Sequence, residues 1–361
     1  LSIAQNNNKD KRVCNTSFCI FFVVIKKMSN LFKKLIILYI FFIPSFNLSA
    51  NEIEFNKWVN SFKLEAINYG ISKQTLDETL SKVRYISKVI EYDRFQPEFY
   101  EDTFTYIKKR ANRSKVKKGL TLYKKNNKFI NLVEKEFAVE KELLLALMGI
   151  ETNFGNYLGK MDILSSLATL SFDKRRSAFF TRELLTLLKL VDDKKIDTKI
   201  LYGSWAGAVG NFQFMPSTIK NYAIDYDKNS VIELKKFDDS FASAANYLNK
   251  IGWKKNSPCF IRIKLKNNIP KKYLNKSAKK INNKKSFKYF KQYIHNSENI
   301  DISEKLLSGI ITPDKDIVAN SNDLDPAYII FDNYELILKW NRSLRFALAV
   351  CTLKKKFKDE I

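Results

Sequence analysis

The spacing of apolar and polar positions predicts a mostly helical protein after residue 50. Ser72 stands where a helix N-cap is expected, and the small-residue-rich stretch 163–172 has the composition of a tightly packed helix. The segments that we expect to be helical are residues 55–66, 72–83, 106–123, 129–137, 163–172, 179–191, 241–251 and 334–353.

Strand patterns come late in the chain. Residues 260–265 alternate between apolar and polar side chains, and short strands are expected at residues 317–319 and 328–331. A Lys- and Asn-rich stretch that runs to about residue 291 separates the first strand from the others. The fold class is therefore α+β, mostly α, with a small β-containing insertion near the C-terminus.

One predicted helix carries a charged residue on its apolar face. Leu144, Leu147 and Met148 recur at helical spacing, and Glu151 follows on the same stripe, in the last turn before a stop expected at Gly155. Partial burial and the negative end of the helix dipole both favour the protonated carboxyl, so they raise its pKa toward the range of a general acid. The alternative is a glutamate that pairs with an arginine or reaches solvent at the helix end.

The first 50 residues have the pattern of an export signal. From Met28, a Lys pair, an apolar run over residues 35–43 and small residues up to Ala50 follow in the order of a secretory signal. We expect residues 28–50 to be the signal peptide and the protein to be periplasmic. We expect no stable membrane anchor, because Asn51, and not a lipid-bearing cysteine, comes directly after the expected cleavage position. Residues 1–27 are explained by a start site assigned too early; an uncleaved anchor is the competing interpretation.

Composition limits the chemistry. The 361 residues include 63 Lys+Arg against 38 Asp+Glu, a formal charge of +25, yet the lysines are diffuse, so we expect no nucleic-acid partner. The single histidine, His295, argues against Ser-His and Cys-His nucleophiles and against histidine-based zinc sites, so we expect any catalysis to depend on carboxylates. Cys259 and Cys351 are consistent with a disulfide in an oxidising compartment, or with Cys351 as a small core residue.

The stretch 203–217 combines glycines, neutral hydrogen-bonding groups and aromatic rings. Ser204, Asn211 and Gln213 stand beside Trp205 and Phe212, a chemistry typical of sugar binding, and no phosphate-loop lysine is present. The alternative is a Gly-rich turn before a buried helix.

A partial calcium loop and an arginine pair are two further candidates. Asp225, Asp227 and Asn229 occupy positions 1, 3 and 5 of such a loop, Ser230 replaces its usual glycine, and Asp238 or Asp239 would have to close it. An ordinary polar turn is the alternative. The adjacent arginines 175 and 176 either hold a carboxylate near Glu151, grip substrate, or are solvated at a helix start.

Five motifs occur in one order: Gly-Ile-Glu-Thr-Asn-Phe-Gly at 149–155, Leu-Ala-Thr-Leu-Ser-Phe at 167–172, the stretch 203–217, Ala-Asn-Tyr with Gly-Trp within 245–253, and Trp-Asn-Arg-Ser at 340–343. Together they resemble the B-type membrane-bound lytic murein transglycosylases over most of the chain after residue 50. The resemblance implies a lysozyme-like helical core, and we expect the protein to be a monomer. It divides the chain into a helical N-terminal part (51–135), the catalytic core (136–254), the insertion (255–330) and a returning C-terminal helix (331–361).

The resemblance also implies an activity. This family cleaves the β-1,4 bond between N-acetylmuramic acid and N-acetylglucosamine in peptidoglycan glycan strands, leaving a 1,6-anhydromuramyl end. Glu151 would be the only acid/base, because the C6 hydroxyl of the sugar attacks in place of water and no second carboxylate is needed. No cofactor is required, and calcium would be structural, bound by Asp225, Asp227, Asn229 and Asp239.

Further site residues are implied position by position. Ser204 and Gln213 would form hydrogen bonds near Glu151, Tyr106 and Tyr247 would line sugar subsites, Arg176 would orient the acid, and Asn341 would contact substrate. Trp340 stands where the family usually has tyrosine, so it keeps a stacking face and loses the hydroxyl. A hydrolytic muramidase and a non-catalytic peptidoglycan-binding protein are the alternatives.

Overall fold

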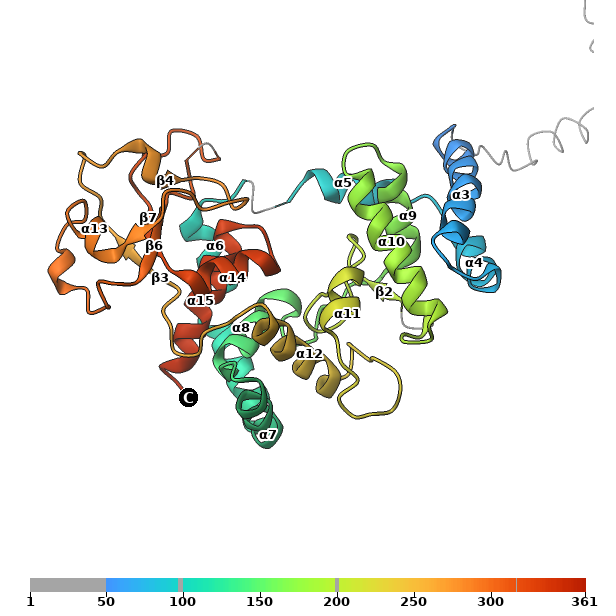
Figure 1. The fold of residues 1–361 in the computed structure, drawn as a ribbon, viewed down its shortest axis with the longest axis horizontal. Helices are drawn as coiled ribbons and strands as arrows, with labels where there is room; N and C mark the ends of the chain where they lie inside the picture. Colours follow the sequence, from blue (N-terminus) through green and yellow to red (C-terminus); the bar gives the residue numbers. More distant parts are fainter. Residues whose placement is uncertain (1–49, 97–99, 199–200, 316) are drawn as a thin grey trace, which may run out of the picture. The chain divides into compact units, whose positions relative to one another are not determined.

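The computed structural model describes residues 50–96, 100–198, 201–315 and 317–361, and residues 51–361 form one compact unit (Figure 1). The expected signal peptide, apart from Ala50, and the stretch before it lie outside the described residues. Among the residues that are described, no helix is both long enough and apolar enough to cross a membrane.

Helices dominate the described chain, as the sequence predicts. The α-helices are α3 (Ala50–Asn68), α4 (Lys73–Thr79), α5 (Ser87–Arg94), α6 (Thr103–Arg110), α7 (Arg113–Phe137), α8 (Lys141–Thr152), α9 (Ile163–Phe172), α10 (Ser177–Asp192), α11 (Pro216–Tyr222), α12 (Phe237–Lys250), α13 (Phe287–Lys291), α14 (Asp332–Trp340) and α15 (Leu344–Lys358). Ser72 is the N-cap of α4, because its side chain accepts a hydrogen bond from the Thr75 amide.

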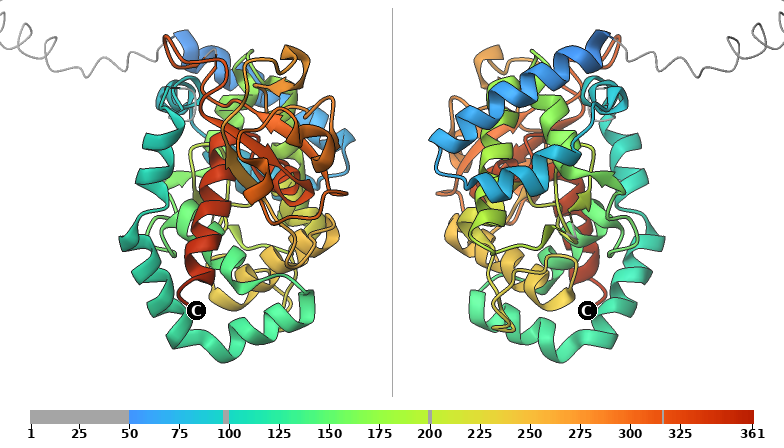
Figure 2. Two further views of the ribbon diagram at one scale, coloured as in Figure 1. Left: turned by 90° about the vertical axis from the view of Figure 1, so that its left-hand side faces the viewer. Right: turned by 90° about the vertical axis from the view of Figure 1, so that its right-hand side faces the viewer.

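The centre of the fold is α8. Every residue from Leu143 to Gly149 is buried, and α15 packs along α8, as the side views show (Figure 2). A buried polar network around Asp314 joins α6 and α15 to the segment that follows β6 (Leu307–Ile311). Asp314 accepts hydrogen bonds from the Thr103 amide at the start of α6 (3.0 Å) and from the Arg345 guanidinium in α15 (2.9 Å). Removing Asp314 or Arg345 would leave the other charge buried without its ion-pair partner, so this pair holds α15 in place.

The late strands form a small mixed sheet. The order is β3 (Phe260–Ile263), β7 (Ala327–Ile330), β6 (Leu307–Ile311) and β4 (Leu274–Asn275), and β5 (Lys285–Ser286) also pairs with β6. Side chains alternate along β7, so Tyr328 and Ile330 join the main helical core while Ala327 and Ile329 join a second core inside the insertion. The sheet therefore lies between two apolar layers, which explains why β7 is buried on both faces.

A disulfide joins the start of this sheet to the last helix. Cys259, just before β3, is bonded to Cys351 in α15, 92 positions later. Of the two alternatives that the sequence left open for these cysteines, the structure selects the bond.

The structure corrects four expectations about elements. Residues 317–319 are a turn that begins at Asp314, and the third long strand is β6, whose Ser308 and Gly309 hide its pattern. Residues 106–123 are interrupted where Asn112 caps α7, which then continues through a kink at Asn126 to Phe137. The expected helix 334–353 is two helices, broken at residues 341–343, where the Ser343 side chain caps α15. The fourth correction concerns the end of α8, described below.

Candidate active site

Glu151 is the second-last residue of α8 and is half-buried at the end of an otherwise buried helix. The helix stops at Asn153 and Phe154, whose φ values of 51° and 60° are left-handed, rather than first at Gly155. Asparagine tolerates this conformation and phenylalanine rarely adopts it. The turn therefore ends the helix within two residues of the carboxylate.

Tertiary contacts hold this strained turn in place. The Thr152 hydroxyl donates to the Asn211 carbonyl (2.8 Å) and accepts from the Gly155 amide (3.0 Å), which ties the end of α8 to the Gly-rich stretch. The Lys115 ammonium, in α7, donates to the Gly149 carbonyl and so offsets the negative end of the helix dipole. Burial, with Lys118 and Arg110 nearby, lowers the pKa of Lys115.

Trp340 contacts the Glu151 carboxylate directly. Its indole Nε1 donates a hydrogen bond to Glu151 Oε1 at 3.0 Å, from the last residue of α14. The sequence indicated the stacking face of Trp340 but not this bond. Because an indole nitrogen can only donate, Oε1 is an acceptor whether Glu151 is protonated or ionised.

Aromatic rings fix the indole. Trp340 stacks on Tyr247 with centroids 5.0 Å apart, and Phe214 meets it edge-on at 5.3 Å. Tyr222 stacks on Tyr247 at 4.4 Å, so both faces of Tyr247 are occupied by protein. Burial raises the pKa of Tyr247 to about 12, and its hydroxyl donates to the Lys339 carbonyl. In this structure Tyr247 supports Trp340 instead of presenting an open face to a sugar.

The Gly-rich stretch forms a tight loop before α11. The Ser204 hydroxyl accepts from the amides of Ala206 (3.3 Å) and Ala208 (2.9 Å), and the Gln213 amide donates to the Gly210 carbonyl (2.9 Å). Gly210 has φ of +77°, and a Cβ there would collide with the Leu234 carbonyl. Gln213 itself is left-handed, with φ of 51°. Ser204 and Gln213 thus shape the loop that receives the end of α8; their contact with a substrate stays a prediction.

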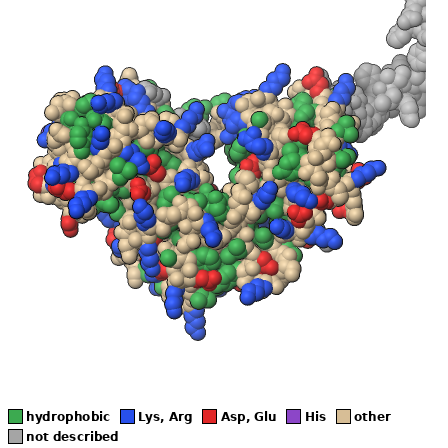
Figure 3. Space-filling view, viewed as in Figure 1, with side chains coloured by type: hydrophobic (Ala, Val, Ile, Leu, Met, Phe, Trp, Pro, Cys, Tyr) green, Lys and Arg blue, Asp and Glu red, His purple; other side chains and the backbone are tan. Residues whose placement is uncertain are grey.

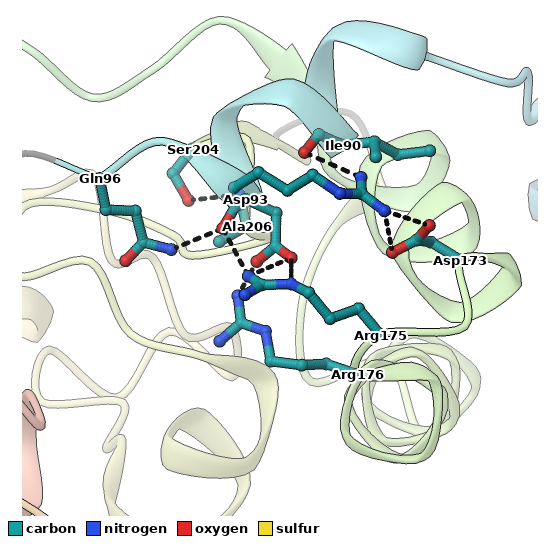
Figure 4. Close-up of polar contacts among 9 residues, drawn as sticks. Ile90, Asp93, Gln96, Asp173, Arg175, Arg176, Ser204 and Ala206 are labelled. Carbon is teal, nitrogen blue, oxygen red and sulfur yellow. Dashed lines mark hydrogen bonds and ion pairs between the residues drawn. The ribbon is translucent and has the colours of Figure 1, made fainter. Parts of the chain in front are cut away.

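The arginine pair holds a carboxylate that the sequence did not indicate (Figure 4). Asp93, at the end of α5, is 2 % exposed and accepts from Arg175 Nε at 2.7 Å and from the Arg176 guanidinium. Neither arginine is merely solvated, and the pair fastens α5 to the start of α10. Nothing local marks Asp93, which lies 82 positions before Arg175. A role of Arg176 toward the acid stays a prediction.

Two expected substrate residues differ in accessibility. Tyr106 is 3 % exposed, and the Arg110 guanidinium covers its ring at 3.6 Å from the centroid. Asn341 is half-buried at the C-cap of α14, and within the described residues its side-chain amide forms no hydrogen bond. Asn341 is therefore better placed than Tyr106 to offer hydrogen-bonding capacity to a ligand.

The structure also brings together the expected calcium ligands. Carboxylate oxygens of Asp225, Asp227 and Asp239 lie within 4.8 Å of one another, so Asp239 closes the loop. Asn229 lies in the same loop, and its side-chain amide donates to Asp227 (2.9 Å). Three converging carboxylates form a hard-oxygen set that suits Ca²⁺.

Comparison with known proteins decides the family. The model of the transglycosylase SLT domain matches residues 54–355. The chain belongs to this transglycosylase family. Membrane-bound lytic murein transglycosylase B of Escherichia coli K12 is 34% identical over 197 residues, which is 52% of this chain and 55% of that protein. The aligned part thus spans about half the length of this relative.

Solved transglycosylase structures share the fold. SltB3 from Pseudomonas aeruginosa, in complex with NAG-anhNAM-pentapeptide, superposes with a TM-score of 0.73 at 28% identity, covering 84% of this chain and 79% of that one. The Escherichia coli lytic transglycosylase Slt35 in complex with calcium gives 0.68 at 25% identity, covering 86% and 94%. The predicted family and the mostly helical, lysozyme-like fold class are confirmed.

Proposed function

We propose that this protein is a lytic transglycosylase that cleaves the β-1,4 bond between N-acetylmuramic acid and N-acetylglucosamine in peptidoglycan glycan strands. One observation carries the proposal. A half-buried carboxylate, Glu151, is held at the end of a buried helix by a rigid donor, Trp340, 189 positions away. Family membership and the relatives that bind murein fragments support the choice of substrate.

Glu151 would act twice, first as an acid that donates one proton and then as a base that accepts another. In the first step the neutral carboxyl protonates the glycosidic oxygen, the C1–O bond breaks, and the N-acetylglucosamine end leaves as an alcohol. In the second step the resulting carboxylate accepts the proton of the muramyl C6 hydroxyl while O6 bonds to C1, which forms the 1,6-anhydro ring and restores the acid. Because the nucleophile belongs to the sugar, no water and no second carboxylate take part.

Trp340 fits both steps. Since Oε1 accepts the indole bond throughout, the transferable proton resides on Oε2. A hydrogen bond to an oxygen that gains negative charge strengthens as the proton leaves, so Trp340 stabilises the transition state more than the resting acid. The half-buried amide of Asn341 is next to it in sequence and is proposed to bind the sugar.

Calcium and location complete the proposal. Asp225, Asp227, Asn229 and Asp239 would hold a calcium ion, which would neutralise the converging carboxylates and stiffen the loop before α12. We place the enzyme in the periplasm, a location that the signal pattern motivates and that the Cys259–Cys351 bond supports, because disulfides persist in oxidising compartments.

The test is to digest purified sacculi with wild type and with Glu151→Gln, and to analyse the products. We expect 1,6-anhydromuramyl fragments from wild type and at least a hundredfold slower release from the variant, on the order of the cost of losing a general acid. Glu142→Gln, the same change at the start of α8, is the matched control and should retain activity.

Other outcomes either refute the role of Glu151 or indicate a different function. Equal release by Glu151→Gln refutes the catalytic assignment. Reducing muramyl ends in place of anhydro ends indicate a hydrolytic muramidase. Sacculus binding without release by either protein indicates a non-catalytic binding protein.

A further inference from the structure

A basic pocket lies between α14 and the loop that follows β4. The cavity measures about 320 Å³. Its apolar lining includes the buried side chains of Ile281 and Leu338, and four exposed cationic residues surround them. These residues are Lys279, Lys280, Lys339 and Arg342.

Both walls of this pocket are fixed. At the base of the loop, the buried Asn275 side chain accepts from the Asn282 amide (2.7 Å) and donates to the Ile310 carbonyl in β6 (2.9 Å). Beyond the loop, the Lys284 ammonium bonds to Glu335 in α14 at 2.5 Å. These three bonds join the loop to the sheet and to the helix, so the pocket exists before any ligand arrives.

The charges in the pocket are unbalanced. Glu335 is the one carboxylate among the lining residues, and Lys284 already neutralises it. Within the part of the chain that the structure describes, none of the four cationic side chains forms a salt bridge. Elsewhere the Lys and Arg side chains are spread over the viewed surface (Figure 3). Four unpaired cations around an apolar lining suit a small aliphatic group that carries a carboxylate.

Two residues that line the pocket are close in sequence to Trp340, which contacts the proposed catalytic group. Lys339 and Arg342 flank Trp340 and Asn341, and Trp340 binds Glu151. Arg342 is two residues from Trp340, and two residues of chain span at most about 7 Å. An extended pentapeptide reaches roughly 17 Å. A peptide attached to the muramyl sugar that reacts at Glu151 could therefore reach the pocket.

We propose that this pocket binds the carboxylate end of the peptide stem on the muramyl residue, and so selects glycan strands that carry stems. The inference rests on the proposed function, because it takes the stem from that substrate. The stem is aliphatic and acidic at its free end, which matches the apolar lining and the cationic rim.

A charge reversal tests the proposal. Lys279→Glu/Lys280→Glu should lower kcat/KM about tenfold on glycan strands with stems and leave it unchanged on strands stripped of stems by an amidase, with a loss that shrinks at high salt. Lys124→Glu/Lys125→Glu, an exposed pair on α7, is the matched control and should change neither. An equal loss on both substrates, or no loss on strands with stems, overturns the proposal.

A binding measurement separates this proposal from the proposed function. Calorimetry with a muramyl pentapeptide and with its C-terminal amide needs no cleavage. We expect wild type to bind the free carboxylate several-fold more tightly, and Lys279→Glu/Lys280→Glu to lose this preference. Equal affinity of wild type for both ligands overturns the pocket assignment, whereas failure of wild type to cleave any strand overturns the proposed function alone.

Discussion

Breaking the Cys259–Cys351 bond should destabilise the protein strongly, because the bond closes a long stretch of chain. The two cysteines are 92 positions apart, and the closed loop contains the five-stranded sheet, α13, α14 and Trp340. In the chain-entropy relation for cross-links, a loop of that length removes about 16 cal/mol/K from the unfolded ensemble, or roughly 4.6 kcal/mol at 25 °C. Residual structure in the unfolded chain reduces this value, so we expect a loss of about 3–5 kcal/mol.

The measurement is equilibrium unfolding in urea, followed by far-ultraviolet circular dichroism, for wild type and Cys259→Ala/Cys351→Ala. The slope of unfolding free energy against urea should also rise in the variant, because the open chain exposes more surface when it unfolds. Wild type with reductant should approach the variant, and the variant should not respond to reductant. This control separates the cross-link from the loss of two buried side chains.

A small effect would refute the reasoning. If the variant lost less than about 1 kcal/mol, the loop would already be constrained in the unfolded state or the bond would not form in solution. The native contacts around Trp340 do not depend on the bond itself, so activity well below the unfolding transition should stay close to wild type. An early loss of activity would instead show that the bond positions the site.

Three further predictions concern other contacts. Trp340→Phe keeps an aromatic ring and removes the hydrogen-bond donor to Glu151, so kcat should fall roughly ten- to a hundredfold with little change in KM. Tyr247→Phe should lower kcat far less. Equal losses of kcat for the two variants, measured by product release, would contradict the role assigned to Trp340. Buried Glu140 accepts from Lys354, and although burial would raise its pKa, Lys354 and further hydrogen bonds hold it below the ordinary 4.5. The ionised Glu140 therefore stabilises the folded protein fully above pH 4.5, and this contribution is lost as the pH falls through the folded-state pKa. At pH 7, Glu140→Gln should lose about 3–5 kcal/mol of unfolding free energy. The difference in unfolding free energy between variant and wild type should become smaller in acid. Millimolar Ca²⁺ should raise the thermal midpoint of wild type but not of Asp239→Asn, and an equal rise would place the ion elsewhere.

The sequence predicted those parts of the site that are set by residues close together in the chain. The apolar spacing before Glu151 predicted a buried helix with a carboxylate in its last turn, because helical periodicity repeats every few residues. Likewise, the oxygen-bearing residues near Asp225 predicted a metal loop, and the structure brings the Asp239 carboxylate to those of Asp225 and Asp227, while metal binding there stays a prediction. Such patterns need no knowledge of distant parts of the chain.

Contacts between distant segments were decided by the tertiary structure. The bond from Trp340 to Glu151 spans 189 positions, and it requires the break between α14 and α15 that a continuous apolar pattern concealed. Asp93 was equally invisible, because an ordinary acidic residue acquires its role only when folding buries it under two arginines. By itself, the sequence determined the helices, the charged residue on an apolar face and the family resemblance. Which donor meets that carboxylate, and which cations of the pocket beside α14 form no salt bridge within the described residues, depended on long-range packing that no local pattern encodes.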